Sequence, residues 1–550
     1  MKIALAQLNY HIGNFEKNVA AILAAIKKGK DQKADLVVFA ELALCGYPPR
    51  DFLNYPEFIG RCQKAIEEIA AECKGVAALV GAPSVNPNPK GKRLLNSAFF
   101  IAEGKVQKII SKTLLPTYDV FDEYRYFEPN NKFEVIQHQG VNLAVTICED
   151  IWNLGDRPMY TISPMDKLMA QEPDAIINIA ASPFSYAHLE ERKKVAMENA
   201  KKYKLPVFYL NHVGAQTELI FDGGSMVINP HGELYDELLP FEEDFKIYKL
   251  GMIADPDAPT PGKNPTKIIP PKIQRIHDAL VMGIREYFTK MNFQKAVIGL
   301  SGGVDSAVVL LLAKKALGKE NVKAILMPSQ FSTDHSVKDA EELAKSTGIP
   351  YEIIPIEKLY TSFMTSLKGI FGNSPFGLAE ENLQARIRGT LLMAISNKFG
   401  HILLNTTNKS EMAVGYGTLY GDMAGGLAVL GDVYKTDVYE IAAYLNKTKK
   451  IIPANIISKA PSAELRPDQK DADSLPDYSV LDKILYQYIE LSKGAEEIIK
   501  MDMPADVVKK TIRMVDYSEY KRYQFAPILR VSGKAFGMGR RMPIVAKYST

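Results

Sequence analysis

A glycine-containing turn constrains the fold of this chain more than any other part of the sequence. The stretch reads KAVIGLSGGVDSAVVLLLAKKAL from residue 295 to residue 317. An apolar run ends at Leu300, a Ser-Gly-Gly turn follows, and Asp305 and Ser306 open an apolar segment of helical character. The order of strand, turn and helix start predicts one unit of a sheet in which strands alternate with helices.

The turn has the properties of a phosphate-binding loop. Gly302 and Gly303 carry no Cβ, so the loop can bring backbone N–H groups close to an anion, while the helix N-terminus adds its positive end. The G-x-x-x-x-G-K-[ST] loop puts a lysine on the β- and γ-phosphates, whereas here Asp305 follows the glycines and suits Mg²⁺ held against a pyrophosphate. A strand-to-helix turn with no ligand is the simpler alternative.

A proline-rich stretch divides the chain into two halves. Residues 255–271 read DPDAPTPGKNPTKIIPP and contain six prolines, whose fixed φ and missing donor suit an exposed spacer. We therefore expect two α/β domains, at 1–255 and 272–550, joined by a linker at 256–271. A long surface loop within one domain is the alternative. The first half predicts a layered α/β sandwich, and the second a doubly wound parallel sheet that binds ligands beyond its carboxyl strand ends.

Composition limits the classes of partner. The net charge is only +3, so no general affinity for nucleic acid or for an anionic membrane is expected. The N-terminus has no signal-peptide layout, and no apolar run reaches the ~18 residues of a membrane span. The four cysteines show no metal-ligand spacing, and a chain of 550 residues needs no disulfide staples. We therefore expect a cytoplasmic protein.

Three reactive side chains in the first half each lie at or just past the end of an apolar strand. Glu41 follows ADLVVFA, Lys112 follows KVQKIIS, and Cys148 follows VNLAVTI. Strand ends gather in space, and together the three supply a base, a cation for an oxyanion and a nucleophile, which is the set that acyl transfer needs. Taken singly, Cys148 also fits a small buried hydrophobe, and Glu41 with Lys112 fits an ion pair at a sheet rim.

These residues stand in segments that carry a family resemblance. Glu41, the segment KTLLPTYDVFDEYRYF at 112–127, and the segment ICEDIW at 147–152 resemble the nitrilase-type amidase superfamily. The full sequence of the 112–127 segment is similar to that of the glutaminase domain of glutamine-dependent NAD synthetases. The resemblance implies an N-terminal nitrilase-like α-β-β-α sandwich.

The second half carries further motifs of the same family. The loop at 301–306, ENLQARIRG from residue 381, NTTNKSE from residue 405 and PSAELRPDQKDADSLP from residue 461 resemble the family's synthetase domain. The S-G-G-x-D-S loop is shared with other ATP pyrophosphatases, such as GMP synthetase and tRNA-thiolating enzymes, so alone it is less specific. The resemblance implies a C-terminal doubly wound parallel sheet of the ATP pyrophosphatase, adenine nucleotide alpha hydrolase-like, class.

The resemblance assigns roles to residues of the first half. Glu41 is expected to be the general base, Cys148 the nucleophile on the side-chain amide of glutamine, and Lys112 the stabiliser of the oxyanion and then of the thioester. The residues expected to hold the glutamine or to support this set are Tyr118, Glu123, Ser182 and His188.

Two of these positions carry alternatives or departures. Glu123 is expected to be a second acidic residue that supports Lys112, and a surface carboxylate beside Arg125 is the alternative. The family usually has S-P-F-x-x-G-K, whereas SPFSYAH here places Ala187 and His188 at the glycine and lysine positions. We expect His188 to contact the substrate in place of the lysine.

The resemblance also assigns ligand positions in the second half. ATP is expected at Gly299, Leu300, Ser301, Gly302, Gly303, Val304, Asp305, Ser306, Thr406, Lys435 and Ser462. Deamido-NAD is expected at Asn382, Arg386, Glu411 and Lys521, and Mg²⁺ at Asp305 and Glu411. Asn382 and Arg386 are four residues apart, so on a helix they share one face. Lys435 and Lys521 also fit plain surface lysines, and Tyr520 stands where the family often has histidine.

The function that the resemblance implies is that of an NAD-forming ligase. Such an enzyme adenylates the nicotinic acid carboxylate of deamido-NAD with ATP, and ammonia released from glutamine, through a hypothetical closed passage, displaces AMP. Two alternatives stay open: an amidotransferase of the ATP pyrophosphatase class that acts on another carboxylate or carbonyl acceptor, and a non-catalytic nucleotide or glutamine sensor. We expect the small molecules deamido-NAD, ATP and glutamine as substrates, and a homo-oligomer.

Overall fold

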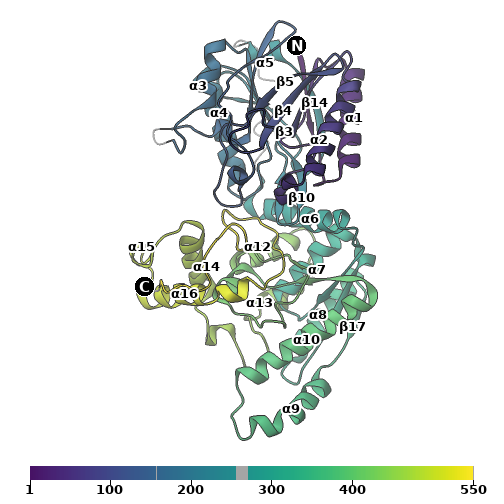
Figure 1. The fold of residues 1–550 in the computed structure, drawn as a ribbon. Coiled ribbons are helices and arrows are strands. Elements are labelled where there is room, and N and C mark those ends of the chain that lie inside the picture. Colours follow the sequence, from purple (N-terminus) through teal and green to yellow (C-terminus); the bar gives the residue numbers. More distant parts are fainter. Residues whose placement is uncertain (156–157, 256–269, 549–550) are drawn as a thin grey trace. The chain divides into compact units, whose positions relative to one another are not determined.

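The computed structural model describes residues 1–155, 158–255 and 270–548 (Figure 1). The chain divides into two compact units, Met1–Ile269 and Pro270–Thr550, called here unit 1 and unit 2. All but the last two residues of the expected linker at 256–271 lie outside the described residues. The expected domain limits stay a prediction.

Two six-stranded sheets build unit 1, with the orders β14-β1-β2-β3-β4-β5 and β13-β12-β9-β8-β7-β6. Strands β1, β2 and β3 run parallel, as do β7, β8 and β9, whereas the outer strands of both sheets pair antiparallel. The bounds are β1 (Lys2–Gln7), β2 (Leu36–Val38), β3 (Ala77–Val85), β4 (Leu94–Ala102), β5 (Lys105–Ser111), β6 (Ile136–His138), β7 (Val141–Ile147), β8 (Ala175–Ile179), β9 (Val207–Leu210), β12 (Met226–Ile228), β13 (Leu234–Glu237) and β14 (Asp244–Lys249). A separate hairpin joins β10 (Val213–Gln216) to β11 (Leu219–Asp222).

Apolar side chains fill the space between the two sheets and beneath the helices that cover them. Strand β2 shows why, because Leu36 and Val38 lie in the core shared by the sheets while Val37 lies in the core under the helices. Successive side chains of a strand point to opposite faces, so a continuous apolar run is buried on both. The covering helices are α1 (Phe15–Asp31) and α2 (Pro56–Glu72) on the first sheet, α3 (Pro164–Leu168) and α4 (His188–Tyr203) on the second; α5 (Leu250–Ala254) follows β14. The expected α-β-β-α sandwich is confirmed.

Unit 2 is built on a five-stranded parallel sheet with the order β17-β16-β15-β18-β19. From β15 (Lys295–Gly299) the chain passes through α7 (Val304–Leu317) to β16 on one side and later returns to β18 on the other. Because the strand order reverses at β15, a crevice is expected beyond its carboxyl end, where the phosphate-binding loop lies. The doubly wound sheet is confirmed. The other strands are β16 (Val322–Leu326), β17 (Tyr351–Ile353), β18 (His401–Asn405) and β19 (Leu427–Ala428).

Helices surround this sheet and add a helical layer after it. Helix α6 (Lys272–Lys290) packs against α7, and α10 (Leu378–Phe399) packs against β15 and β18. Helices α11, α14 and α16 contact one another around a separate apolar cluster. The remaining bounds are α8 (Asp334–Thr347), α9 (Glu357–Phe371), α11 (Lys409–Val414), α12 (Lys435–Leu445), α13 (Ala454–Ser458), α14 (Tyr478–Leu485), α15 (Ala495–Ile499), α16 (Ala505–Tyr517) and α17 (Glu519–Arg522).

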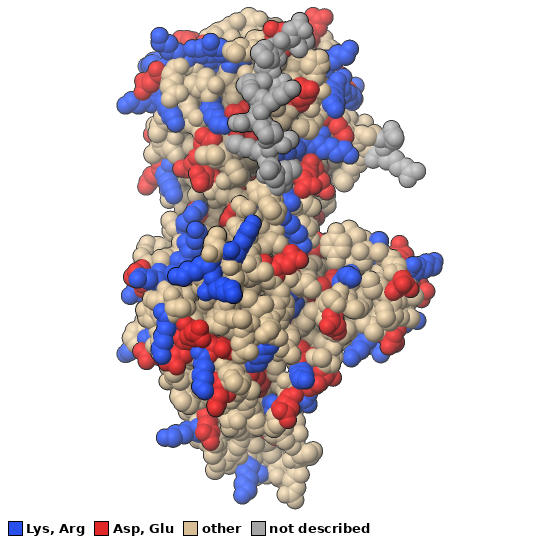
Figure 2. Space-filling model, turned by 180° about the vertical axis from the view of Figure 1, so that it is seen from behind, with Lys and Arg blue, Asp and Glu red and all other residues tan. Residues whose placement is uncertain are grey.

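The surface carries both signs of charge. Basic and acidic side chains are interspersed on the face shown in Figure 2, in keeping with the net charge of +3. Within the described ranges, no helix combines the length and apolar character that crossing a membrane requires.

Candidate active sites

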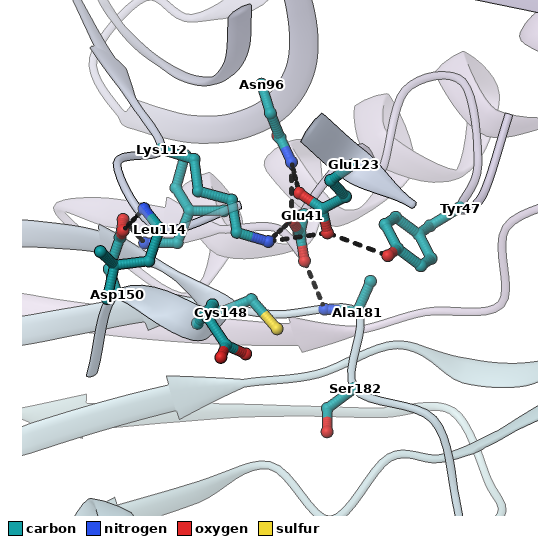
Figure 3. Close-up of polar contacts among 12 residues, drawn as sticks. Glu41, Tyr47, Asn96, Lys112, Leu114, Glu123, Cys148, Asp150, Ala181 and Ser182 are labelled. Atoms are coloured by element: carbon teal, nitrogen blue, oxygen red, sulfur yellow. Dashed lines mark hydrogen bonds and ion pairs between the residues drawn. The ribbon is translucent and has the colours of Figure 1, made fainter. Parts of the chain in front are cut away.

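Three strands of unit 1 end close together, and their ends carry Glu41, Lys112 and Cys148 (Figure 3). Lys112 directly follows β5, Cys148 directly follows β7, and Glu41 lies in the turn after β2. The Nζ of Lys112 lies 2.7 Å from Oε1 of Glu41, and both side chains are fully buried. In Figure 3 the side chain of Cys148 lies next to this pair. We call Glu41, Lys112, Glu123 and Cys148 the thiol site.

Glu123 is the second carboxylate of the thiol site. Its Oε1 accepts hydrogen bonds from Nζ of Lys112 at 2.8 Å and from the hydroxyl of Tyr47 at 2.9 Å. Because Glu123 is only 5% exposed, its reading as a surface carboxylate beside Arg125 is wrong. Lys112 is therefore shared between two carboxylates.

Three donors fix the orientation of Glu41. Oε1 accepts from Nζ of Lys112 and from Nδ2 of Asn96, each at 2.7 Å, and Oε2 accepts from the backbone N–H of Ala181 at 3.0 Å. Asn96 also donates to Glu123 at 3.3 Å. Neither Asn96 nor Ala181 was expected from the sequence, because each reaches the site from a different strand or strand end.

Burial and the neighbouring charges keep the thiol of Cys148 protonated. Burial raises the pKa of the Cys148 thiol well above its usual range, and the carboxylate of Glu41 adds to this while Lys112 opposes it. Burial disfavours the charged form of Lys112, but Glu123 and Glu41 outweigh it and hold the pKa of the ammonium above its ordinary value. Cys148 is therefore a thiol that needs a base, and Lys112 remains a cation.

The backbone at Cys148 has an unusual conformation. Its φ is +45°, in the left-handed region, where β7 meets the short 3₁₀ helix Cys148–Ile151. A non-glycine residue in this region costs roughly 1–3 kcal/mol and persists where its surroundings fix it. The carbonyl oxygen of Cys148 accepts from Nδ2 of Asn178 at 3.3 Å. The turn thus keeps the thiol at the strand end.

Asp150 connects the two segments that carry the lysine and the cysteine. One carboxylate oxygen accepts from the backbone N–H groups of Thr113 at 3.0 Å and Leu114 at 2.8 Å, directly after Lys112. The other accepts from the N–H of Ile147 at 3.1 Å, directly before the cysteine. Burial raises the pKa of Asp150 to about 6. The contacts make Asp150 a positioning residue for the thiol site.

Replacing Asp150 with asparagine should slow the glutamine hydrolysis expected from the sequence while leaving KM nearly unchanged. An amide has one acceptor oxygen, so it can bind the Thr113 and Leu114 side or the Ile147 side, but not both. We expect kcat to fall by about 10- to 100-fold, the size of effect that small displacements of reacting groups produce. The rate at which iodoacetamide alkylates Cys148, followed by mass spectrometry of its peptide, should fall in parallel.

Asp174 provides the matched control, since its carboxylate accepts the N–H of Asn142 at 2.7 Å near the opposite end of β7. Asp174→Asn should leave both rates near wild type. Unchanged alkylation in Asp150→Asn, or equal losses in the two variants, would contradict the positioning role.

A second buried carboxylate lies beside the cysteine. Glu149 accepts the hydroxyl of Tyr118, at 3.0 and 2.9 Å from its two oxygens, and the hydroxyl of Tyr160 at 3.1 Å. Burial raises the pKa of Glu149. Tyr118 was expected from the sequence to hold the glutamine, whereas Glu149 was not, although it directly follows the cysteine in the ICEDIW motif.

The structure also brings Ser182 and His188 together. Nε2 of His188 lies 3.1 Å from Oγ of Ser182, and Nδ1 lies 3.1 Å from Oε2 of Glu191. The imidazole stacks on the indole of Trp152, with ring centroids 5.0 Å apart. Ser182 follows Ala181, whose N–H binds Glu41 of the thiol site. His188 is the first residue of helix α4. The indole of Trp152 packs against one face of its imidazole ring.

Unit 2 contains a cavity of about 300 Å³, called here the nucleotide cavity, which the loop after β15 lines. The residues expected to bind ATP that line it are Gly299, Leu300, Ser301, Gly303, Val304, Asp305, Ser306, Thr406, Lys435 and Ser462. Gly302 does not belong to the lining, but its φ of +80° and the 2.3 Å between an added Cβ and the carbonyl oxygen of Ser336 require glycine there.

A charged group lies on the wall of the nucleotide cavity. Nζ of Lys435 lies 2.5 Å from Asp305 and 3.4 Å from Glu411, and Nδ2 of Asn408 donates to Asp305 at 2.9 Å. Lys435 is only 3% exposed, so its reading as a surface lysine is wrong. Burial raises the pKa of Glu411 to about 8, and the carboxylate of Asp305 adds to this while Lys435 opposes it.

Three of the residues expected to bind deamido-NAD lie apart from the cavity lining. Asn382 accepts the hydroxyl of Thr418 at 2.8 Å, and Nε of Arg386 donates to the carbonyl oxygen of Leu419 at 3.3 Å. Nζ of Lys521 donates to the carbonyl oxygens of residues 415 and 417, at 2.7 and 2.8 Å. All three therefore hold the same segment, residues 415–419. Asn382 and Arg386 share one face of α10, as their spacing predicts.

Several residues of the cavity wall were not expected from the sequence. Arg388 donates through Nε to the carbonyl oxygen of Met327 at 3.0 Å, and burial lowers the pKa of its guanidinium to about 10. Lys459 and Glu464 also line the cavity. Arg388 stands in the ENLQARIRG motif and Glu464 in the PSAELR motif, so the motifs contained a signal that their spacing alone did not reveal.

Comparison with family models agrees with this division of the chain. The carbon-nitrogen hydrolase family matches residues 2–251, and the NAD synthase family matches residues 276–525. The chain combines a nitrilase-type sandwich that holds a buried cysteine with a parallel sheet that carries a phosphate-binding loop. This combination defines the class of two-domain amidotransferases.

Relatives extend over the whole chain. The glutamine-dependent NAD(+) synthetase of Synechocystis sp. is 44% identical over 555 residues, with 99% of both chains covered. The chain belongs to the family of glutamine-dependent NAD(+) synthetases. The Acinetobacter baylyi member is 42% identical, with 99% of this chain and 98% of its own covered.

Solved structures show the same fold. The glutamine-dependent NAD+ synthetase of Acinetobacter baumannii, in complex with ADP, is 40% identical and matches with a TM-score of 0.76, covering 99% of this chain and 98% of its own. The enzyme of Cytophaga hutchinsonii matches with a TM-score of 0.82 over 99% of this chain and 98% of its own, at 19% identity, which shows the shared fold alone.

Proposed function

We propose that this chain is a carbon–nitrogen ligase that forms NAD from deamido-NAD, ATP and glutamine. The observation that carries the proposal is the whole-length identity of 44% to a glutamine-dependent NAD(+) synthetase, in a chain that has both a thiol site and a nucleotide cavity. Unit 1 hydrolyses glutamine to glutamate and ammonia. Unit 2 adenylates deamido-NAD with release of pyrophosphate, and ammonia displaces AMP. Action on another acceptor is not favoured by this identity.

The glutaminase reaction uses three residues of the thiol site, Glu41, Lys112 and Cys148. Glu41 removes the thiol proton as the sulfur of Cys148 attacks the amide carbon of glutamine, and Lys112 stabilises the negative oxygen that forms. The proton then passes to the amide nitrogen, which leaves as ammonia and creates a thioester. Water, activated by the same carboxylate, hydrolyses the thioester to glutamate and restores the thiol.

Recognition of glutamine follows from charge and position. The carboxylate of Glu149 lies beside the cysteine and has the sign that an α-ammonium group requires, while Tyr118 fixes its orientation at 2.9 Å. Ser182 and His188 supply a hydroxyl and an imidazole for the α-carboxylate of the same substrate. The stacking of His188 on Trp152 supports this placement, because the ring is held in one orientation.

The adenylation reaction takes place at the nucleotide cavity. A carboxylate oxygen of the nicotinic acid group attacks the α-phosphorus of ATP, and the bond to the pyrophosphate oxygen breaks. The N–H groups of the loop around Gly303 and the N-terminus of α7 stabilise the charge on the phosphates. Asn382 and Arg386 bind the dinucleotide, which requires that residues 415–419 release them.

Mg²⁺ is implied by the family, and the residues of the nucleotide cavity fit it. Asp305 and Glu411 offer the carboxylate oxygens that this ion prefers, and they face one shared lysine, Lys435. Within the described part of the chain, no cluster of three or more histidine, cysteine, aspartate or glutamate side chains forms a site for a metal. Asp305 and Glu411 are the residues that would hold the ion. When bound, the ion neutralises charge on the pyrophosphate.

A product assay tests the proposed function. The purified protein is incubated with ATP, Mg²⁺ and glutamine, together with either deamido-NAD or xanthosine monophosphate. We expect NAD, AMP and pyrophosphate in equal amounts with deamido-NAD, and no amidated product with xanthosine monophosphate. Amidation of xanthosine monophosphate alone would favour another acceptor, and absence of pyrophosphate with either would favour a sensor.

We also propose that the chain forms a homo-oligomer through helix α9. Leu359, Phe363 and Ile370 lie along one stripe of the helix and are 40, 48 and 82% exposed, while Tyr360 is the only buried residue of α9. An apolar stripe without a partner marks a contact surface. Light scattering should give a multiple of the chain mass, and Phe363→Lys with Ile370→Lys should lower it. A native protein of one chain's mass would contradict the proposal.

We further propose a cytoplasmic location. All four cysteines are free and buried, as expected for a protein of a reducing compartment. Fractionation of cells that express the tagged chain would test this location, and recovery in an extracellular or membrane fraction would contradict it.

A further inference from the structure

One carboxylate oxygen on the wall of the nucleotide cavity receives three side-chain donors. Oε1 of Glu464 lies 2.5 Å from Nζ of Lys459, 2.7 Å from Oγ of Ser336 and 3.1 Å from Oγ1 of Thr333. Lys459 also contacts the hydroxyl of Ser336. Donors that converge on one negative oxygen form a site for an anion, whichever molecule carries that oxygen.

The site of these donors adjoins the phosphate-binding loop. Ser336, Lys459 and Glu464 line the nucleotide cavity together with residues 299–306 other than Gly302. A Cβ on Gly302 would stand 2.3 Å from the carbonyl oxygen of Ser336, so the loop touches the first turn of helix α8. Thr333 is the N-cap of that helix, which has 14 residues, and its side chain accepts the N–H of Ser336. The helix N-terminus therefore adds positive potential at the same place.

The charge of the cavity leaves a role for Lys459. The loop after β15 has an aspartate where the G-x-x-x-x-G-K-[ST] loop has a lysine for the terminal phosphates. Lys435 pairs with Asp305 at 2.5 Å, so its charge is already balanced near the start of α7. Lys459 lies at the end of α13 and its partner is Glu464, and nothing in the adenylation steps derived above requires that pair.

We propose that Thr333, Ser336 and Lys459 bind the terminal phosphates of ATP and the pyrophosphate that leaves, and that Glu464 occupies this anion site while no nucleotide is bound. The inference rests on the proposed function and specifies its pyrophosphate subsite. A phosphate oxygen accepts the same hydrogen bonds as a carboxylate oxygen, and two oxygens cannot occupy the one position at which Lys459, Ser336 and Thr333 converge. Nucleotide binding therefore displaces Glu464 and with it the segment at 461–465.

The experiment measures the affinity of the full-length protein for inorganic pyrophosphate by calorimetry, without deamido-NAD or glutamine. Lys459→Met should weaken binding about tenfold, or about 1.4 kcal/mol. Glu464→Gln should strengthen binding by a similar factor, because the competing negative charge is lost. Opposite signs are the expected signature, since damage to the fold would weaken binding in both variants.

Lys338→Met is the matched control, because Lys338 is an exposed lysine of the same helix α8 and carries the same charge. Its affinity for pyrophosphate should equal that of wild type. Equal weakening in Lys338→Met and Lys459→Met would assign the effect to general charge, and weaker binding in Glu464→Gln, with an unchanged melting temperature, would make the pair structural. Either result overturns the inference, as would unchanged affinity in Lys459→Met.

The proposed function and this inference fail in different ways. NAD formation by the wild type, together with unchanged pyrophosphate affinity in the Lys459 and Glu464 variants, would support the proposed function and exclude the pyrophosphate subsite. Opposite shifts of the pyrophosphate affinity in the two variants, without NAD formation by the wild type, would support the pyrophosphate subsite and exclude deamido-NAD as the acceptor.

Discussion

Replacing Cys148 with alanine should abolish NAD formation from glutamine and leave NAD formation from added ammonia near the wild-type rate. The substitution removes the only atom of the thiol site that can form a thioester, because Glu41 and Lys112 serve the transition state of that attack. We expect the glutamine-dependent rate to fall by a factor on the order of 10³ or more. The ammonia-dependent rate is measured at alkaline pH, where more of the ammonia is unprotonated.

Cys62→Ala is the control for this experiment. Cys62 is a buried, free cysteine of α2 in the same unit, but it lies in the core beneath the helices. Its loss should leave both rates within about twofold of wild type while lowering stability by about 1 kcal/mol. Loss of both activities in a folded Cys148→Ala protein would make Cys148 structural, and retention of both would remove its role as nucleophile.

Replacing Asp305 with asparagine should reduce NAD formation with either nitrogen donor and spare glutamine hydrolysis. The change keeps the shape of the side chain but removes a negative charge beside Glu411, one of the two carboxylates that would hold the proposed ion. It also removes the partner that holds Nζ of Lys435 at 2.5 Å. We expect a decrease on the order of 10²- to 10³-fold in the rate of pyrophosphate release, as for loss of one strong electrostatic contact to a reacting group.

Asp506→Asn is the matched control, because Asp506 is also an aspartate in the first turn of a helix of unit 2, α16. It should leave NAD formation unchanged, which separates an effect at the nucleotide cavity from a general effect of losing a first-turn charge. Wild-type synthesis by Asp305→Asn at saturating Mg²⁺ would exclude a metal role for Asp305.

The meeting of Glu41, Lys112 and Cys148 was predictable because it depends on the chain direction alone. Glu41 and Cys148 follow mostly buried apolar strands, Lys112 follows the more exposed strand β5, and the ends of strands come together in a layered α/β fold. The donors that complete the site were not predictable. Asn96 reaches Glu41 from within β4, and Tyr47 reaches Glu123 from a separate turn, so only the packed fold brings them within 2.7 and 2.9 Å.

The same contrast holds in unit 2. The spacing of Asn382 and Arg386 predicted a shared helix face, which is a local property of the chain. Their contacts with residues 415–419 depend on the way that segment packs over α10, which no local pattern records. Strand β14, at Asp244–Lys249, has no clear sequence signal either, since as an edge strand with mostly half-buried side chains it lacks a continuous apolar run.

The hold of Asn382, Arg386 and Lys521 on residues 415–419 makes that segment an internal competitor of the dinucleotide. Under the proposed function, only molecules in which residues 415–419 have released these three side chains can bind deamido-NAD. The measured dissociation constant therefore exceeds the intrinsic one by the inverse of the fraction of such molecules. A substitution within residues 415–419 that weakens these contacts would raise the fraction and tighten binding without adding any contact to the ligand. The affinity of this enzyme for its substrate is therefore adjustable from positions that the substrate never touches.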